Sequence, residues 1–183
     1  KSRDAVKSVS NAPLGITLAM QEYTINVEDD SHRSAAEAMR NQAWDGLEDC
    51  FLEVAKGDDY FGVQTYTRER FDQNGRIKPD ADMRKTIMGY EFRPQALEAC
   101  IRRAWDKTGN VPIIVTENGI ATSDDNERIE YVHGALEGVE RRKKARGKPG
   151  KYRLIGRERG YHGTNFGGIS VGGIVRNRMT YGP

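Results

Sequence analysis

The chain has 183 residues, enough for one ordinary domain, and its charged (31%) and apolar (37%) fractions are those of a soluble protein. Its 29 Lys and Arg nearly balance 27 Asp and Glu, so the net charge of +2 does not favour a nucleic-acid partner. The sequence has no apolar run near the roughly 20 residues that cross a bilayer, and no apolar signal core follows its first residues. Composition therefore excludes the membrane, secreted, collagen-like and disordered classes, and we expect a cytoplasmic protein.

Three short apolar runs are typical of buried strands. They lie at 14–20, 60–66 and 111–116, and each follows turn-forming Pro or Gly residues. Near-continuous apolar runs of this length suit parallel strands that are covered on both faces.

Three stretches between and after these strands have helical periodicity, at 31–51, 94–109 and 124–139. The last begins with Asp124 and Glu127, which have the spacing of a capping box. Strands that alternate with helices predict an α/β fold with a parallel sheet. The apolar rows expected to face the core are Ala35, Met39, Ala43, Leu47 and Phe51; Leu97, Ile101 and Ala104 or Trp105; and Ile129, Val132, Leu136 and Val139.

The two cysteines, Cys50 and Cys100, both fall within these helical patterns. We expect buried thiols in a reducing compartment, with a disulfide left open as an alternative. The three histidines, His32, His133 and His162, have no spacing that suggests a metal site, so no metal is expected.

The first candidate for chemistry is Glu117, in the segment Thr116-Glu117-Asn118-Gly119 that follows the third predicted strand. Parallel α/β sheets and (β/α)₈ barrels place their active sites at this end of their strands. A lone Glu there is more often a helix cap or a loop ligand than a catalyst, and the residues alone favour that structural interpretation.

Longer motifs resemble a known family. Residues 111–121 (VPIIVTENGIA), followed by 124–125 and 128–131, resemble the nucleophile region of glycoside hydrolase family 1. Residues 58–67 resemble its sixth-strand signature, and 88–94 with 96–97 resemble its approach to the seventh strand. That family comprises β-glucosidases and β-galactosidases on a (β/α)₈ barrel. The resemblance implies that residues 1–139 form a partial (β/α)₈ barrel with about three parallel strands and helices.

The same resemblance implies roles for four residues. Glu117 matches the nucleophile of a retaining β-glycosidase, Tyr66 matches a tyrosine that hydrogen-bonds it, and Gln64 stands where the family usually has Asn. Gln64 and Asn118 are expected to bind substrate. These roles agree with the chemistry, because hydrogen bonds to a carboxylate favour the ionised form that a nucleophile needs.

Retaining hydrolysis also needs an acid, about 5–5.5 Å from the nucleophile. The family supplies it from an Asn-Glu-Pro motif on the fourth strand, and this sequence has no such motif. We therefore expect a chain that starts after the fourth strand and lacks the eighth. Glu22, which follows the first predicted strand, and after it Glu91 are the candidates for a substitute acid, but a Glu on such a loop is usually only solvated, and we expect that of Glu22. The implied function is weak or absent hydrolysis of β-glucosides. The alternative is a non-catalytic fragment that self-associates, since open strand edges favour a homo-oligomer.

The end of the chain resembles another family. After a basic linker at 140–151, residues 152–183 resemble class III PLP-dependent aminotransferases of the ω-amino acid:pyruvate type, in which Tyr161 would stack on the cofactor. The lysine, aspartate and phosphate loop that such enzymes need lie outside this stretch, so no cofactor is expected and a PLP-binding remnant is an outside alternative. The basic run has no interleaved aromatic residues, which makes nucleic acid an unexpected partner. Two unrelated families joined near residue 140 indicate a chimera.

Overall fold

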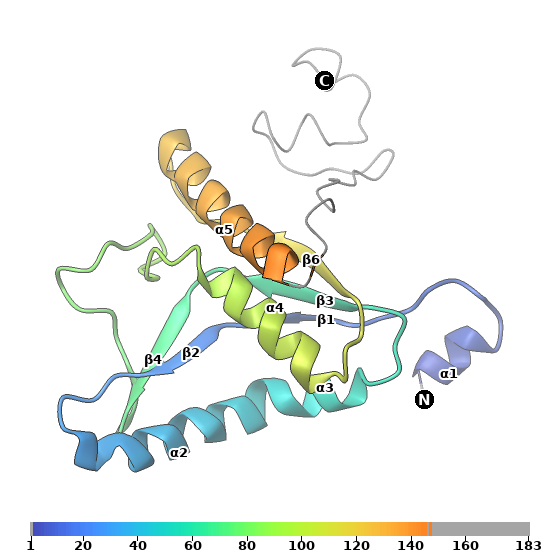
Figure 1. Cartoon of the computed structure of the whole chain (residues 1–183), viewed down its shortest axis with the longest axis horizontal. Coiled ribbons are helices and arrows are strands. Elements are labelled where there is room, and N and C mark those ends of the chain that lie inside the picture. The colour runs from blue at the N-terminus through green and yellow to red at the C-terminus, as the bar shows by residue number, and fades with distance from the viewer. Residues whose placement is uncertain (1, 146, 148–183) are drawn as a thin grey trace. The chain divides into compact units, whose positions relative to one another are not determined.

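The computed structural model describes residues 2–145 and 147 (Figure 1). Its main sheet has three parallel strands in the order β1-β3-β6: β1 (Thr17–Ala19), β3 (Phe61–Thr65) and β6 (Ile113–Asn118). The three predicted strands and their parallel direction are thus confirmed, and so is the α/β class of a partial barrel.

A second, smaller sheet was not predicted. It contains β2 (Glu22–Ile25), β4 (Arg68–Asp72) and β5 (Gly75–Ile77), with β2 parallel and β5 antiparallel to β4. Its strands are short and rich in charge, so they lack the apolar run that marks a buried strand. Arg70 of β4 is nevertheless buried, and Asp80 accepts a hydrogen bond of 3.0 Å from its guanidinium.

All three predicted helices are present. The helical elements are α1 (Ser2–Lys7), η1 (Asp30–His32), α2 (Arg33–Trp44), the π-helical turn η2 (Asp45–Asp49), α3 (Cys50–Val54), α4 (Ala96–Lys107) and α5 (Asp125–Ala145). Helix α5 continues through Ala145, so the first residues of the basic stretch 140–151 are helical. The rest of that stretch apart from Gly147, and the whole of 152–183, lie outside the described residues.

The core-facing row predicted for 31–51 is wrong by one position. Ala36, Glu48 and Leu52 are buried, whereas Leu47 is 59% and Phe51 47% exposed. The remaining members of the predicted row are exposed (Ala35) or half-buried (Met39 and Ala43). The polar residue Glu48 occupies an inward position that hydrophobicity alone assigns to an apolar residue.

The prediction of two buried cysteines is right for one and wrong for the other. Cys100 on α4 is a buried free thiol as predicted, but Cys50 at the start of α3 is exposed, and both are unpaired.

The row predicted for α5 is wrong at Ile129, Val132 and Leu136, whereas Val139 packs against the core as predicted. Tyr131 and Ala135 are buried, while Ile129 is 66% and Leu136 46% exposed. Of the other two residues in the predicted row, Val132 is 38% exposed and Val139 is half-buried. Small residues line the contact: a Cβ added at Gly134 would lie 3.1 Å from the Pro94 side chain, and one added at Gly138 would lie 3.2 Å from that of Glu98. Close helix packing thus selects glycine and alanine where the periodicity favours larger side chains.

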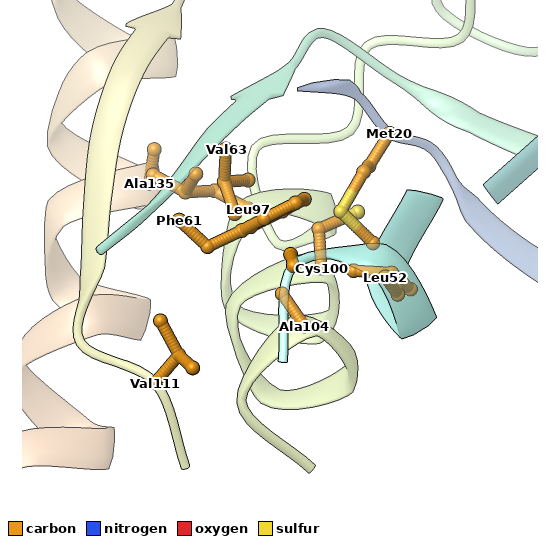
Figure 2. Close-up of a cluster of buried hydrophobic side chains, with 10 residues drawn as sticks. Met20, Leu52, Phe61, Val63, Leu97, Cys100, Ala104, Val111 and Ala135 are labelled. Carbon is orange, nitrogen blue, oxygen red and sulfur yellow. The ribbon is translucent and has the colours of Figure 1, made fainter. Parts of the chain in front are cut away.

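The hydrophobic core lies between one face of the main sheet and the helices (Figure 2). Phe61 and Val63 of β3 point toward Leu97, Cys100 and Ala104 of α4. Its other members are Met20, Leu52, Ala55, Val111 and Ala135.

The opposite face of the sheet carries the side chains that alternate with these. Gly62 lies there between Thr17 and Thr116, and the two threonine hydroxyls are hydrogen-bonded at 2.8 Å. On the same face Ile114 is 48% exposed, so the expected cover on both faces is not found in the described part of the chain. No helix among the described residues is long and apolar enough to cross a membrane.

Candidate active site

The side chains of Gln64, Tyr66 and Glu117 meet at the carboxyl ends of β3 and β6. Gln64 Nε2 donates a hydrogen bond of 3.0 Å to Glu117 Oε1, and the Tyr66 hydroxyl donates one to Glu117 Oε2. Each carboxylate oxygen therefore has its own donor. The structure brings together three of the four residues named for this site, at the strand ends where the sequence placed them.

A β-bulge in β6 makes this arrangement. Val63 of β3 pairs with Val115, but the next residue of β3, Gln64, pairs with Glu117, so Thr116 is an extra residue in β6. Side chains alternate between the two faces of a strand, and one extra residue moves every later side chain to the other face. The bulge therefore turns Glu117 to the open face beside Gln64 and away from the face that packs on α4.

The fourth predicted residue, Asn118, ties the two strand ends together. Its Nδ2 donates a hydrogen bond of 2.7 Å to the carbonyl oxygen of Thr65. This amide nitrogen is therefore engaged within the protein, and substrate binding by Asn118 stays a prediction.

The phenol of Tyr66 stays protonated and donates its hydrogen bond to Glu117. Burial, together with the hydrogen bond to the Glu117 carboxylate and the charge of that carboxylate, raises the pKa of Tyr66 to about 12. At neutral pH the phenol is therefore protonated and available to Glu117, which is itself exposed to solvent.

The two carboxylates proposed as substitute acids are both in ion pairs. Glu22 lies in β2, where Arg93 donates to it through Nε at 2.9 Å and through Nη2 at 3.4 Å, and Arg68 donates to both oxygens of Glu91. The Glu22 side chain is only 15% exposed, so the expectation of a solvated loop residue is wrong. Each of these carboxylates is therefore held by an arginine within the protein rather than free to reach a substrate.

One residue at the site was missed. Tyr131 of α5 is fully buried, and its hydroxyl donates a hydrogen bond of 2.8 Å to the carbonyl oxygen of Tyr66. The helical row predicted for α5 contains its neighbour Val132 instead. A signal was present, because Tyr131 closes the motif 128–131 that follows the nucleophile region.

Other candidate sites carry less. Among the described residues no group of three or more His, Cys, Asp or Glu is placed to share a metal ion. Tyr161 and His162 lie outside the described part. Two surface hollows of about 500 and 540 Å³, one between β4 and the 76–91 loop and one between β2, α2 and α4, are not lined by Glu117.

Solved structures that are similar to this chain are β-glycosidases, in agreement with the resemblance seen in the sequence. A β-glycosidase, BGL167, is 35% identical with a TM-score of 0.69, over 80% of this chain and 33% of that protein. A second solved structure, the β-glucosidase 1317, is 27% identical with a TM-score of 0.61, over 75% of this chain and 31% of that enzyme. The chain resembles the β-glycosidases of glycoside hydrolase family 1. It spans about a third of the length of the β-glycosidases it matches, and no family model matches it.

Sequence relatives confirm both resemblances. A β-galactosidase of Sulfolobus acidocaldarius is 27% identical over 182 aligned residues, covering 76% of this chain and 35% of that enzyme. An ω-aminotransferase of Caulobacter vibrioides is 60% identical over 57 residues, covering 31% of this chain and 13% of that enzyme. Two unrelated families thus match one chain, as expected for a chimera.

Proposed function

We propose that this chain carries the nucleophile half of a retaining β-glycosidase site and acts on β-glucosides with good leaving groups. The observation that supports this most directly is the carboxylate of Glu117, which receives a hydrogen bond on each oxygen at the carboxyl end of a parallel strand. The similarity to β-glycosidases supports the substrate class.

The chemistry requires an ionised carboxylate that is held in place. A Glu117 oxygen attacks the anomeric carbon, the bond from that carbon to the aglycone oxygen breaks, and the aglycone leaves with the bonding electrons. Water then attacks the anomeric carbon of the glycosyl ester, gives up a proton to solvent and releases Glu117. Tyr66 and Gln64 keep the carboxylate oriented throughout.

The leaving group decides the rate. General acid catalysis contributes about 10²–10⁴-fold, and both carboxylates considered for that role, Glu22 and Glu91, are committed to arginines. An aglycone that leaves as a stable anion, such as nitrophenolate, needs no acid. Alkyl glycosides and disaccharides are therefore expected to be very poor substrates.

The test is hydrolysis of 4-nitrophenyl β-glucoside by the wild-type chain and by Glu117→Gln, which keeps the shape and removes the nucleophile. The variant should lose at least about 100-fold in rate. Glu130→Gln is the matched control, because Glu130 lies on α5 in an exposed ion pair with Arg84 and should not affect the rate. Equal rates for wild type and Glu117→Gln would exclude Glu117 as the nucleophile.

A second candidate function is self-association without catalysis. It is favoured by the large apolar side chains that α5 and β6 leave in solvent, with Ile129 66%, Ile114 48% and Leu136 46% exposed. Failure to bind glucose in solution, with no hydrolysis, would favour this second candidate.

A further inference from the structure

We propose that Tyr131 of α5 is a positioning residue for this site: its hydroxyl fixes the backbone of Tyr66 and thereby the reach of the Tyr66 phenol to Glu117. The inference rests on the proposed role of Glu117. It goes further by adding a residue from a helix that does not itself reach the carboxylate.

The first step is the position of Tyr66 in the chain. Strand β3 ends at Thr65 and β4 begins at Arg68, so Tyr66 lies in the two-residue connection where the two ladders change over. Its carbonyl oxygen accepts the 2.8 Å hydrogen bond from Tyr131. A backbone group outside a ladder needs such a partner to hold one conformation.

The second step is that Tyr131 joins both halves of the site. Asn118, the residue next to Glu117, lies close enough to the Tyr131 phenol to act on it electrostatically, and its side chain donates a hydrogen bond of 2.7 Å to the Thr65 carbonyl oxygen. The phenol of Tyr131 is thus hydrogen-bonded to Tyr66 at one strand end and lies near Asn118 at the other. Removing it loosens both strand ends at once.

The third step separates the hydroxyl from the ring. The ring of Tyr131 packs edge-on against Phe92, with centroids 5.3 Å apart and planes at 90°. A phenylalanine at position 131 keeps this contact and loses only the oxygen. The variant Tyr131→Phe therefore tests the hydroxyl alone.

The kinetic test uses 4-nitrophenyl β-glucoside. Tyr131→Phe should lower kcat about three- to tenfold with KM unchanged, the effect of a weaker hydrogen bond from a less well positioned Tyr66 to Glu117. Because Tyr131 acts through Tyr66, the double variant Tyr66→Phe/Tyr131→Phe should be no slower than Tyr66→Phe alone. Effects that multiply in the double variant would overturn the proposal.

A second buried tyrosine provides the control. Tyr23 of β2 is 7% exposed and packs against Phe71 of β4 in the second, smaller sheet, with ring centroids 5.3 Å apart. Tyr23→Phe removes a comparable hydroxyl and should leave kcat unchanged. An equal fall in kcat in Tyr23→Phe would reduce the effect at Tyr131 to general stability.

A titration of Tyr66 that does not depend on hydrolysis distinguishes the positioning role of Tyr131 from the proposed glycosidase function. With ¹³Cζ-labelled tyrosine, the Tyr66 resonance, identified by its loss in Tyr66→Phe, should titrate near pH 12 in wild type and closer to its ordinary pKa of 10.0 in Tyr131→Phe. Unchanged titration in Tyr131→Phe overturns the positioning role. A shifted titration in a chain that hydrolyses no glucoside upholds the positioning role and refutes the proposed function.

Discussion

Gln64 and Glu117 are cross-strand neighbours because β6 contains one residue more than β3 over the same span. Val63 pairs with Val115 and Gln64 pairs with Glu117, which leaves Thr116 as the bulge. In unbroken register Glu117 would face Thr65, which is fully buried, and its charge would enter the core. The extra residue thus decides whether the Glu117 carboxylate lies beside Gln64 on the open face or is buried as a charge in the core.

The close approach of strands at Gly62 gives a stability prediction. A Cβ at this position would lie 2.7 Å from the Cβ of Thr17, so Gly62→Ala should lower the free energy of unfolding by about 1–3 kcal/mol. Gly46→Ala is the control, since no atom lies within 4 Å of the added Cβ. Urea unfolding of both variants checks the difference, and equal effects would contradict the packing described here.

The corrected helical row can be tested at two adjacent residues. Leu52 is 1% exposed and belongs to the core, so Leu52→Ala should cost about 2–5 kcal/mol of unfolding free energy. Phe51, 47% exposed, should cost less than about 1 kcal/mol when changed to Ala. Were the originally predicted row right, the order of the two thermal shifts would be reversed.

Glu48 gives a prediction for pH dependence. Burial raises its pKa above the ordinary value of 4.5, against the opposing effects of the Gln21 N–H and Arg103. The folded state then holds this proton to higher pH than the unfolded state does. The stability contributed by Glu48 is therefore complete below the unfolded pKa and is lost as pH rises through the folded pKa.

The measurement compares wild type with Glu48→Gln by urea unfolding at about pH 4, 5.5 and 7. The stability of wild type relative to Glu48→Gln should fall as the pH rises. Glu130→Gln should show the opposite sign, because Arg84 lowers the pKa of Glu130 and its contribution is lost as the pH falls. Parallel curves for wild type and Glu48→Gln would show that Glu48 titrates alike in both states.

The exposed apolar face of α5 gives a prediction about assembly. Wild type should elute as an oligomer in size-exclusion chromatography with light scattering. The double variant Ile129→Lys/Leu136→Lys should have a lower mass, because both apolar side chains are exposed on this helix. Val9→Lys, at a position that is 85% exposed outside that helix, should not change it. A monomeric wild type would contradict self-association.

The order and direction of the main elements could be predicted because each depends on local information. Apolar runs bounded by turns located the three strands, and their continuity indicated parallel pairing. The rows of α2 and α5 could not be predicted, because spacings of three and four residues fit adjacent rows equally well. Glu48 faces inward with partners that are distant in sequence: Arg103, 55 residues away, forms an ion pair with it, and the Gln21 N–H, 27 residues away, donates a hydrogen bond.

Some features of the candidate site could be predicted from the sequence and others could not. Glu117, Tyr66 and Gln64 were named from motifs, since the residues that carry chemistry lie within the matched segments. The bulge at Thr116 was not predicted, because a single extra residue leaves no mark in composition or periodicity. The pairing of Glu22 with Arg93, 71 residues apart, depends on the tertiary fold alone.

The extra residue in β6 also sets a rule for grafting. A designer who moves this strand into another parallel sheet has to copy Thr116 together with the carboxylate that follows it. A transplant that is one residue shorter would have nearly the same composition and the same apolar run, and it would deliver its acidic group to the wrong layer of the host.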